Sequence, residues 1–167
     1  MRRVFAVGAA ILALAGCATS ADSADEETTV SRVIDGDTIE TSNGERVRLV
    51  QIDAPELQDG ECYAVESTAA LDELIPAGTE IRLEADPRLD DVDRFGRLLR
   101  YVHREDMNVN LELVSRGAAS VWFFEGDRGR YADELLDAAR AAEDADNGLW
   151  GACPAAGLDP EQGVDTG

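Results

Sequence analysis

The sequence contains no lysine: all 15 of its basic residues are arginines, against 35 aspartates and glutamates. A formal net charge of −20 makes the surface repel itself in dilute buffer, whereas molar salt shortens electrostatic screening to about 3 Å. The acidic excess therefore predicts a protein from a high-salt habitat. An acidic exported protein from a GC-rich genome is the alternative. Such a charge is also unfavourable for binding a polyanion at low salt.

Histidine is almost as scarce. His103 is the only histidine, so the chain has no Cys/His cluster with the spacing of a zinc site. No G-x-S-x-G motif accompanies it, which excludes a serine–histidine hydrolase unless His103 alone serves the triad. We expect His103 to be an exposed residue at the end of a strand.

The only long apolar run, over residues 4–14, is too short to cross a bilayer as a stable helix. Arg2 and Arg3 precede it and small residues follow, which is typical of a secretory signal. The end of the run resembles the lipobox of bacterial and archaeal lipoproteins. That resemblance implies cleavage before Cys17, lipidation of Cys17 and a membrane-anchored protein that faces outside the cytoplasm. Ordinary signal cleavage, with no role for Cys17, is the alternative.

One domain is expected between two polar segments. After a signal over residues 1–16, residues 17–29 are small, polar and acidic, which predicts a flexible tether. Residues 154–167 have the same character and predict a disordered tail. The domain itself is expected over residues 30–153.

Two cysteines remain besides Cys17. In an exported protein, an even number of cysteines besides the lipid-bearing one predicts a disulfide, here between Cys62 and Cys153. Closing a loop of about 90 residues would contribute roughly 4–5 kcal/mol by chain-entropy arguments. Two unrelated buried thiols are the alternative.

Periodicity and turn signals predict strands that are interrupted by helices. The pair Asn43-Gly44 between two β-type segments is a strong hairpin signal. The absence of a βαβ rhythm favours an α+β fold with a small closed barrel. Strands are expected over residues 29–34, 38–41, 46–52, 79–83, 95–102 and 119–124, and helices over 63–75, 109–114 and 131–144.

Four carboxylates stand at two places in the chain. Asp35 and Asp37 follow the first strand, and Asp53 and Glu56 follow the third. Adjacent strands can bring both places to one end of a barrel, where unit charges about 4 Å apart repel by about 4 kcal/mol at an effective dielectric of 20. A hard cation would relieve that repulsion, and calcium prefers carboxylate, carbonyl and water oxygens. Ordinary turn chemistry in an acidic protein is the competing interpretation.

Two arginines accompany these carboxylates. Arg48 lies five residues before Asp53, and Arg97 follows Gly96. Permanently charged guanidinium groups beside a metal suit a phosphate diester whose charge rises in the transition state. Salt bridges to the abundant acids are the alternative role.

Three sequence blocks stand in order along the chain: Val33-Ile34-Asp35-Gly36-Asp37-Thr38, Arg48-Leu49-Val50-Gln51-Ile52-Asp53-Ala54-Pro55-Glu56 and Asp93-Arg94-Phe95-Gly96-Arg97. In this order and spacing they resemble the signature of the staphylococcal nuclease family. Residues 109–114 and 148–151 fit that family's downstream pattern, and the resemblance covers residues 30–153. It implies an α+β fold, a small five-stranded OB-fold β-barrel with about three packed helices.

The resemblance also implies a function: a calcium-dependent endonuclease that hydrolyses DNA and RNA with low sequence specificity. Asp37, Asp53 and the backbone carbonyl of Ala54 would bind the calcium ion, with Asp35 behind them. Ala54 replaces a threonine that is often found there, which is tolerable if only the carbonyl binds. We expect the protein to be a monomer.

The same resemblance assigns catalytic roles. Glu56 would be the general base or would orient the attacking water, and Arg48 and Arg97 would hold the scissile phosphate. A non-catalytic nucleic-acid- or protein-binding OB module on a membrane tether is the alternative function. A structural calcium-binding surface protein is a third, but such a site gains nothing from nearby cations.

The aromatic residues depart from the family pattern. Phe95 and Phe123 stand where relatives often carry tyrosine, so hydroxyl contacts to phosphate are lost while stacking on bases is retained. Arg94 keeps a basic residue beside the site, and Arg94, Phe95 and Phe123 form the expected substrate-binding set. Trp122 and Phe124 are expected to pack in the core.

Overall fold

The computed structural model describes residues 25–164 and residue 166. The predicted signal segment and Cys17 lie outside the described residues. Within them, no helix is both long enough and apolar enough to cross a membrane. In chain order the elements are β1 (Glu26–Val33), β2 (Thr38–Thr41), β3 (Arg46–Leu49), β4 (Ile52–Asp53), α1 (Ala64–Leu74), β5 (Glu80–Glu84), β6 (Leu98–Arg104), β7 (Met107–Asn108), α2 (Val109–Ser115), β8 (Ser120–Val121), a 3₁₀ turn η1 (Phe124–Gly126), α3 (Ala132–Asp144) and α4 (Leu149–Ala152).

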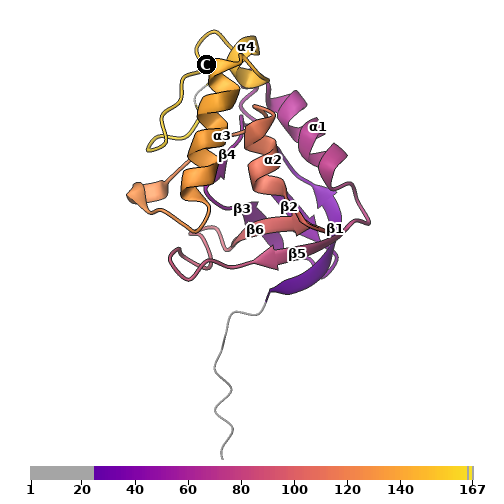
Figure 1. The fold of residues 1–167 in the computed structure, drawn as a ribbon. Coiled ribbons are helices and arrows are strands. Elements are labelled where there is room, and N and C mark those ends of the chain that lie inside the picture. Colours follow the sequence, from indigo (N-terminus) through magenta and orange to yellow (C-terminus); the bar gives the residue numbers. More distant parts are fainter. Residues whose placement is uncertain (1–24, 165, 167) are drawn as a thin grey trace, which may run out of the picture.

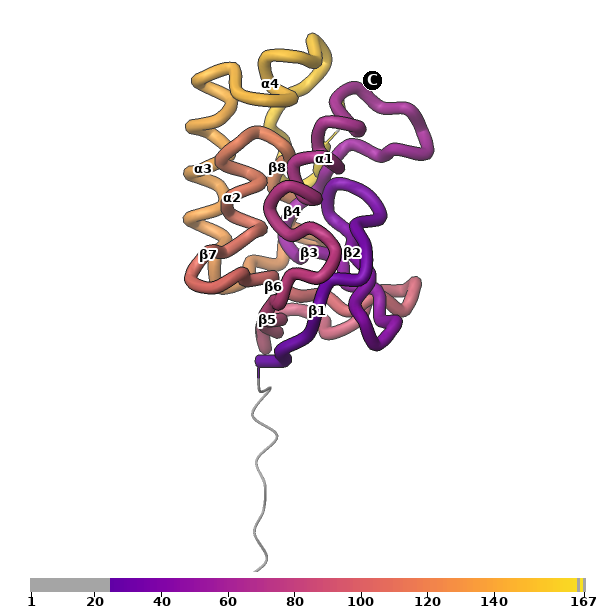
Figure 2. The backbone as a smooth tube through the Cα atoms, turned by 90° about the vertical axis from the view of Figure 1, so that its right-hand side faces the viewer, coloured from indigo at the N-terminus to yellow at the C-terminus, as the bar shows by residue number. Residues whose placement is uncertain are grey.

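The strands close into a barrel. The sheet runs β3-β2-β1-β5-β6-β7, and β3 also pairs with β6 in parallel, which joins the two sides of the sheet. The result is a five-stranded mixed barrel of β1, β2, β3, β5 and β6. Figure 1 shows the helices α1, α2 and α3 gathered on one side of these strands, and in Figure 2 α2 and α3 lie side by side. The α+β, OB-type fold predicted from the sequence is confirmed.

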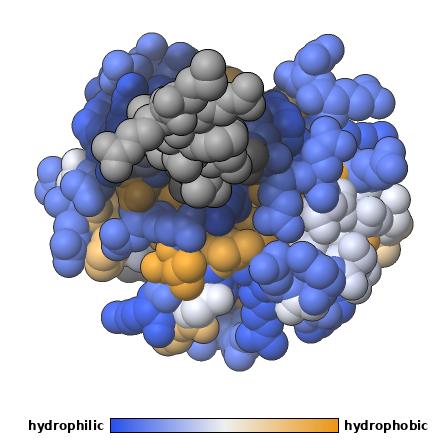
Figure 3. All heavy atoms as spheres, turned by 90° about the horizontal axis from the view of Figure 1, so that it is seen from below, coloured by the Kyte–Doolittle hydropathy of each residue, from blue (hydrophilic) through white to orange (hydrophobic). Residues whose placement is uncertain are grey.

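The core fills the space between the barrel and the helices. Asn110 is its one fully buried amide side chain among the described residues; it accepts a hydrogen bond of 3.0 Å from the Val102 N–H and donates one of 2.9 Å to the Val50 carbonyl. The face shown in Figure 3 is dominated by hydrophilic residues, with an apolar group near its middle and smaller ones toward its edges. The largest fully buried apolar side chains include Ile39, Leu49, Ile52, Leu71, Leu113 and Leu135.

The strand expected over residues 46–52 is broken. Gln51 adopts a left-handed backbone with φ of 66°, which is uncommon for a residue with a side chain. Its amide group bonds the chain far away: Nε2 donates to the Asp127 carbonyl at 2.9 Å, and Oε1 accepts from the Gly129 N–H at 2.7 Å. The break turns the chain out of the barrel, so β4 pairs with β8 instead of continuing β3.

Both ends of the domain extend beyond the limits predicted from sequence. At the start, β1 begins at Glu26, which pairs with Leu83 of β5, inside the expected tether. At the other end, residues 154–164 lie against the domain, in contrast to the expected disordered tail. A disulfide joins Cys62, just before α1, to Cys153, just after α4, and so fixes the point from which this last segment leaves.

His103 is not an exposed residue, so that expectation is corrected. Only 6% of His103 is exposed, and its Nε2 lies 2.7 Å from Glu84 Oε2. Antiparallel pairing sets β5 beside β6, and the start of α3 covers this part of the sheet through Tyr131, whose ring lies 6.2 Å from the His103 ring. The local sequence around His103 cannot show that α3, which begins about 30 residues further along the chain, covers this part of the sheet.

Candidate active site

The turn between β1 and β2 carries Asp35 and Asp37. Gly36 allows this turn to approach the rest of the site, because a Cβ there would lie 2.6 Å from the Cβ of Ala54 and 2.9 Å from that of Ser67. The Asp35 carboxylate accepts a 3.2 Å hydrogen bond from the Asp37 N–H, and the Asp37 carboxylate accepts one of 2.9 Å from the Ala54 N–H. The two places that carry the carboxylates therefore meet in space.

Arg48 on β3 lies between two of these carboxylates. Its Nη1 forms an ion pair with Asp37, and its Nη2 donates to Asp53 Oδ1 at 2.7 Å. The three side chains are largely closed off from solvent, with exposed fractions of 8% for Arg48, 3% for Asp37 and 19% for Asp53. Residues five apart point to opposite faces of a continuous strand. The left-handed turn at Gln51 is what brings Arg48 and Asp53 together.

Negative charge is in excess at this site. Burial raises the pKa of Asp35 to about 6, and the charge of Asp37 adds to the effect. Burial also raises the pKa of Asp53 to about 6, with Asp37 adding to the shift and Arg48 opposing it. At the exposed rim, partial burial and then the charges of Asp37 and Asp35 raise the pKa of Glu56. One buried guanidinium therefore faces more carboxylates than it can neutralise.

A second arginine reaches the same turn from the loop before β6. Asp93 organises this loop: its Oδ1 accepts hydrogen bonds from the Phe95 and Arg97 N–H groups at 2.8 and 2.9 Å, and its Oδ2 pairs with Arg97 Nε at 2.6 Å. Held in this way, Arg97 places Nη1 3.5 Å from the Thr38 hydroxyl, which donates to Asp37. Arg48 thus approaches Asp37 from β3, and Arg97 approaches the same turn from the loop before β6.

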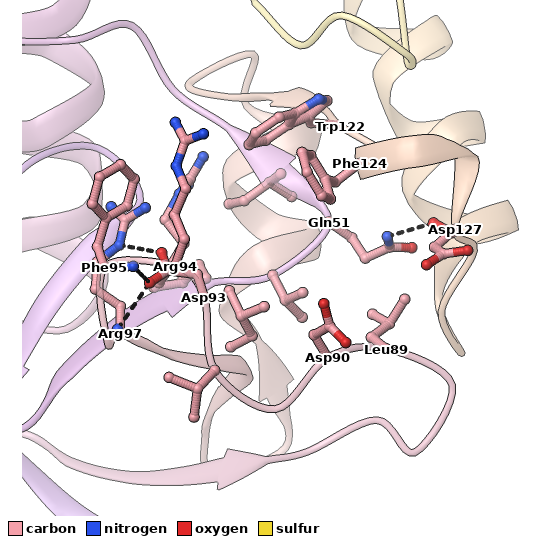
Figure 4. Close-up of a pocket in the computed structure, with 16 residues that line it drawn as sticks. Gln51, Leu89, Asp90, Asp93, Arg94, Phe95, Arg97, Trp122, Phe124 and Asp127 are labelled. Atoms are coloured by element: carbon pink, nitrogen blue, oxygen red, sulfur yellow. Dashed lines mark hydrogen bonds and ion pairs between the residues drawn. The ribbon is translucent and has the colours of Figure 1, made fainter.

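A pocket of about 280 Å³ opens beside the two arginines. Figure 4 shows Phe95 together with Arg97 on one side and Trp122 with Phe124 on the other. The Trp122 and Phe124 rings meet edge to face with centroids 5.5 Å apart, and the Arg48 guanidinium lies 5.8 Å from the Trp122 ring centre. Positive charge and flat apolar rings therefore line one cavity. That combination suits a nucleotide, which has a charged phosphate and a flat base.

A comparison with protein families decides the classification. Residues 46–152 match the family described as "Staphylococcal nuclease homologue". The chain belongs to the staphylococcal nuclease family. The matched range includes Arg48, Asp53, Glu56 and Arg97. Asp37 precedes this range, in the turn between β1 and β2.

Several relatives in this nuclease family carry endonuclease names. An uncharacterized endonuclease of Escherichia coli O157:H7 is 42% identical over 106 residues, which cover 61% of this chain and 63% of that protein. The thermonuclease of Staphylococcus intermedius is 30% identical over 138 residues, or 79% of this chain and 80% of its own. The SPbeta prophage-derived endonuclease YokF of Bacillus subtilis is 31% identical over 131 residues, but this chain covers only 44% of its length. The chain thus spans less than two thirds of two of these relatives.

The aromatic residues of this family member differ from the expected arrangement. Phe123, expected to bind substrate, is only 3% exposed and lies under Arg128, 4.7 Å from its ring centre, outside the pocket. Trp122 and Phe124, expected in the core, line the pocket instead. Side chains alternate at the end of β8: Val121 and Phe123 point inward, so their neighbours point outward.

Arg94 and Phe95, which the family resemblance predicts as substrate-binding residues, both line the pocket. The Arg94 guanidinium lies 4.7 Å from the centre of the Phe95 ring, and the Arg97 guanidinium lies 5.4 Å from the same ring centre. Phe95 is 69% exposed, which leaves most of its ring available for a ligand.

The donor atoms of the site are of the kind that bind a hard divalent cation. Asp37, Asp53 and the Ala54 carbonyl offer oxygens, and burial, with a smaller contribution from the charge of Asp37, raises the pKa of Asp53 even though Arg48 opposes the shift. Among residues 25–164 and 166, no three acidic, histidine or cysteine side chains are grouped to hold an ion. In this structure the Arg48 guanidinium pairs with both Asp37 and Asp53.

Three contributors to the site were not predicted from the sequence. Asp93 positions Arg97, and a signal for this existed, because Asp93 begins the third family block. Gln51 brings Arg48 and Asp53 to one side, and Val164 donates its N–H to Asp53 Oδ2 at 2.9 Å. Neither of these last two carries a local signal, since both act on partners distant in sequence.

Proposed function

We propose that this chain is a metal-dependent nuclease that hydrolyses phosphodiester bonds in DNA and RNA, with calcium as its ion. The observation that carries the proposal is the convergence of Arg48 and Arg97 on the turn that bears Asp37. Family membership and the endonuclease names of the relatives point to the same reaction class.

Each side chain takes a role that suits its environment. Asp37, Asp53 and the Ala54 carbonyl would hold the calcium ion, and Asp35 fixes the backbone of Asp37 from behind. When bound, calcium supplies positive charge that polarises a phosphate oxygen and orients a water molecule. Glu56 is exposed at the rim and accepts the proton of the attacking water, and its raised pKa brings it closer to the pH at which a general base works best.

The two arginines bind the phosphate. Arg97 is fixed by Asp93 through Nε, and its Nη1 makes only a long contact of 3.5 Å with the Thr38 hydroxyl, so its Nη atoms can meet a phosphate oxygen. Arg48 is engaged by Asp37 and Asp53, and it would turn toward a phosphate once a cation compensates those carboxylates. Arginine side chains placed where charge develops stabilise the transition state more than the bound substrate.

The lining of the pocket supports the proposed low sequence specificity. A base that stacks on Phe95, Trp122 or Phe124 gains about 1–3 kcal/mol whichever base it is. The negatively charged surface opposes a polyanion in dilute buffer, so we expect binding of nucleic acid to improve as salt screens the repulsion.

We also propose that the protein is exported and anchored through lipid on Cys17, as a monomer. The disulfide between Cys62 and Cys153 supports export, because disulfides persist in oxidising compartments. Mass spectrometry of Cys17 in membrane fractions tests the anchor, and a free Cys17 thiol on an intact N-terminus would contradict it.

The direct test is cleavage of single-stranded DNA, duplex DNA and RNA by the full chain, with calcium, with magnesium and with chelator, across a salt series. We expect cleavage of all three with calcium and none with chelator. Tight binding without cleavage in any condition would instead support the non-catalytic OB module.

Two substitutions test the assigned residues. Glu56→Gln should lower kcat by about 10²–10⁴-fold, the usual contribution of a general base, and Arg97→Ala by about 10²–10³-fold. Matched controls are Asp59→Asn in the same exposed loop and Arg140→Ala on the outer face of α3, both expected to cleave normally. Near-normal turnover of the Glu56 or Arg97 variant, in a protein with unchanged circular dichroism, would remove that residue from the mechanism.

A further inference from the structure

Residues 157–164, called here the C-terminal strap, run back from the disulfide to the active site. The Leu158 N–H donates to Glu143 Oε1 at 3.1 Å on α3, and the Pro160 carbonyl accepts a 2.7 Å hydrogen bond from the Phe123 N–H. The strap then reaches Asp53, whose Oδ2 accepts the Val164 N–H at 2.9 Å. In Figure 1 the yellow end of the chain runs beside α3.

The strap has a defined turn of its own. Asp159 Oδ1 accepts the Glu161 N–H at 3.0 Å, Asp159 Oδ2 accepts Gln162 Nε2 at 2.8 Å, and Asp159 forms a bridge with Gly163. This turn directs the backbone of residues 163 and 164 at the Asp53 carboxylate.

The strap covers the side of Asp53 that a ligand would need. Asp53 Oδ1 already binds Arg48, and Oδ2 binds the strap, so both oxygens are occupied by protein donors. Gly163 lies so close that a Cβ on it would stand 2.6 Å from Asp53 Oδ2 and 3.4 Å from the Trp122 ring. The strap therefore touches both the proposed calcium ligand and a wall of the pocket. Calcium takes six to eight oxygen ligands, for which this face of Asp53 offers no space.

The charge of the strap also opposes the substrate. Asp159 and Glu161 lie with Arg128 around a second cavity next to Phe123. Carboxylates at this place carry the same sign as a phosphodiester chain, so they disfavour nucleic acid along the strap.

We propose that the C-terminal strap is an autoinhibitory segment: the Val164 N–H holds Asp53, and the strap must leave Asp53 before a divalent cation and nucleic acid can bind. This inference rests on the proposed function, because it concerns the same site. The disulfide at Cys153 keeps the root of the strap in place, so a released strap stays at high local concentration and can close again.

The test is calcium titration of the full-length, metal-free chain by calorimetry. Val164→Pro removes the N–H donor, and Val164→Ala is the matched control that trims the same side chain but keeps that N–H. We expect Val164→Pro to bind calcium about tenfold more tightly, the factor that corresponds to about 1.4 kcal/mol, and Val164→Ala to bind as the wild type does. Equal or weaker calcium binding by Val164→Pro would overturn the inference and make the strap a positioning element.

A second measurement guards against a folding defect in the proline variant. In the wild-type chain, exchange of the Val164 amide hydrogen should be slow without calcium and should become faster when calcium is added. A chain that ends at Ala155, with Cys153 and its disulfide retained, should also bind calcium more tightly. Protection of Val164 that calcium leaves unchanged would contradict release of the strap.

The outcomes separate the two proposals. If Asp53→Asn abolishes calcium binding while Val164→Pro and the shortened chain bind as the wild type does, the strap inference is overturned and the proposed function stands. If neither the wild type nor any strap variant binds calcium, both fall.

Discussion

Two buried charged clusters on this barrel differ in net charge: one has more carboxylates than cations, and in the other they balance. In the active-site cluster, Asp35, Asp37 and Asp53 share the single buried guanidinium of Arg48. In the second, which we call the Glu84 cluster, one carboxylate receives several donors. Glu84 pairs with Arg130, lies 2.7 Å from His103 Nε2, and accepts a 3.0 Å hydrogen bond from the Tyr131 hydroxyl.

This difference in net charge means that the active-site cluster can gain a cation, whereas the Glu84 cluster needs no further ligand. The charge of the Glu84 carboxylate is balanced by the Arg130 guanidinium, and the cluster ties β5 and β6 to the start of α3. The active-site cluster keeps an excess of negative charge, which is unfavourable in a buried place unless a cation joins it. Charge imbalance, more than burial or the number of ion pairs, therefore distinguishes the functional cluster here.

Removing the central arginine should have the largest effect on this comparison. In Arg48→Met, buried Asp37 and Asp53 lose their only cation, so the free energy of unfolding should fall by about 3–5 kcal/mol in chelator. Calcium should restore more stability to this variant than to the wild type, since an ion that binds only the folded state stabilises it. Urea denaturation with and without calcium measures both quantities.

Arg46→Met is the matched control, because Arg46 lies on the same strand but is exposed. It should change stability little in either condition. An Arg48→Met chain as stable as the wild type in chelator would show that the carboxylates do not need a counter-charge.

An intermediate effect is expected in the balanced cluster. Glu84→Gln leaves buried His103 without its charged partner and should lower the free energy of unfolding by about 1–3 kcal/mol. Because this cluster has no place for an ion, calcium should not reverse the loss, and nuclease turnover of the folded variant should match the wild type. Glu80→Gln, at the exposed start of β5, is the control. If calcium restored the stability of Glu84→Gln, the Glu84 cluster would also bind an ion and the comparison would fail.

The smallest effect concerns the pH dependence of stability. Burial and the positive charge of Arg82 lower the pKa of His103, with Glu84 acting in the opposite direction. The unfolded chain, where histidine titrates near 6.5, therefore takes up a proton before the folded chain does. Stability should fall as the pH drops below about 6.5. His103→Gln should reduce this fall between pH 7 and pH 5, as measured by thermal unfolding; an identical slope in both proteins would contradict the assignment.

Much of the fold and the main site residues could be predicted from local patterns. Asn43-Gly44 marks the hairpin of β2 and β3, and the blocks around Asp37, Asp53 and Arg97 identify the family and hence the barrel. Patterns of this kind depend on residues adjacent in sequence.

Other features depend on partners that lie far along the chain. The meeting of Arg48 with Asp53 is set by Gln51, whose left-handed turn is held by backbone groups 76 and 78 residues away. The outward direction of Trp122 and the burial of His103 follow from which strand or helix covers each face.

The strap is the clearest case of this dependence. Residues 157–164 have the composition of a disordered tail, and the Val164 N–H finds Asp53 only because the barrel, the helices and the disulfide bring residues 111 apart into contact. The sequence alone determined the family, the barrel and the chemical identity of the site's residues, because these follow from local order and spacing. Tertiary structure alone decided which of those residues touch, since burial, hydrogen bonding and charge balance depend on neighbours that are close only in the folded chain.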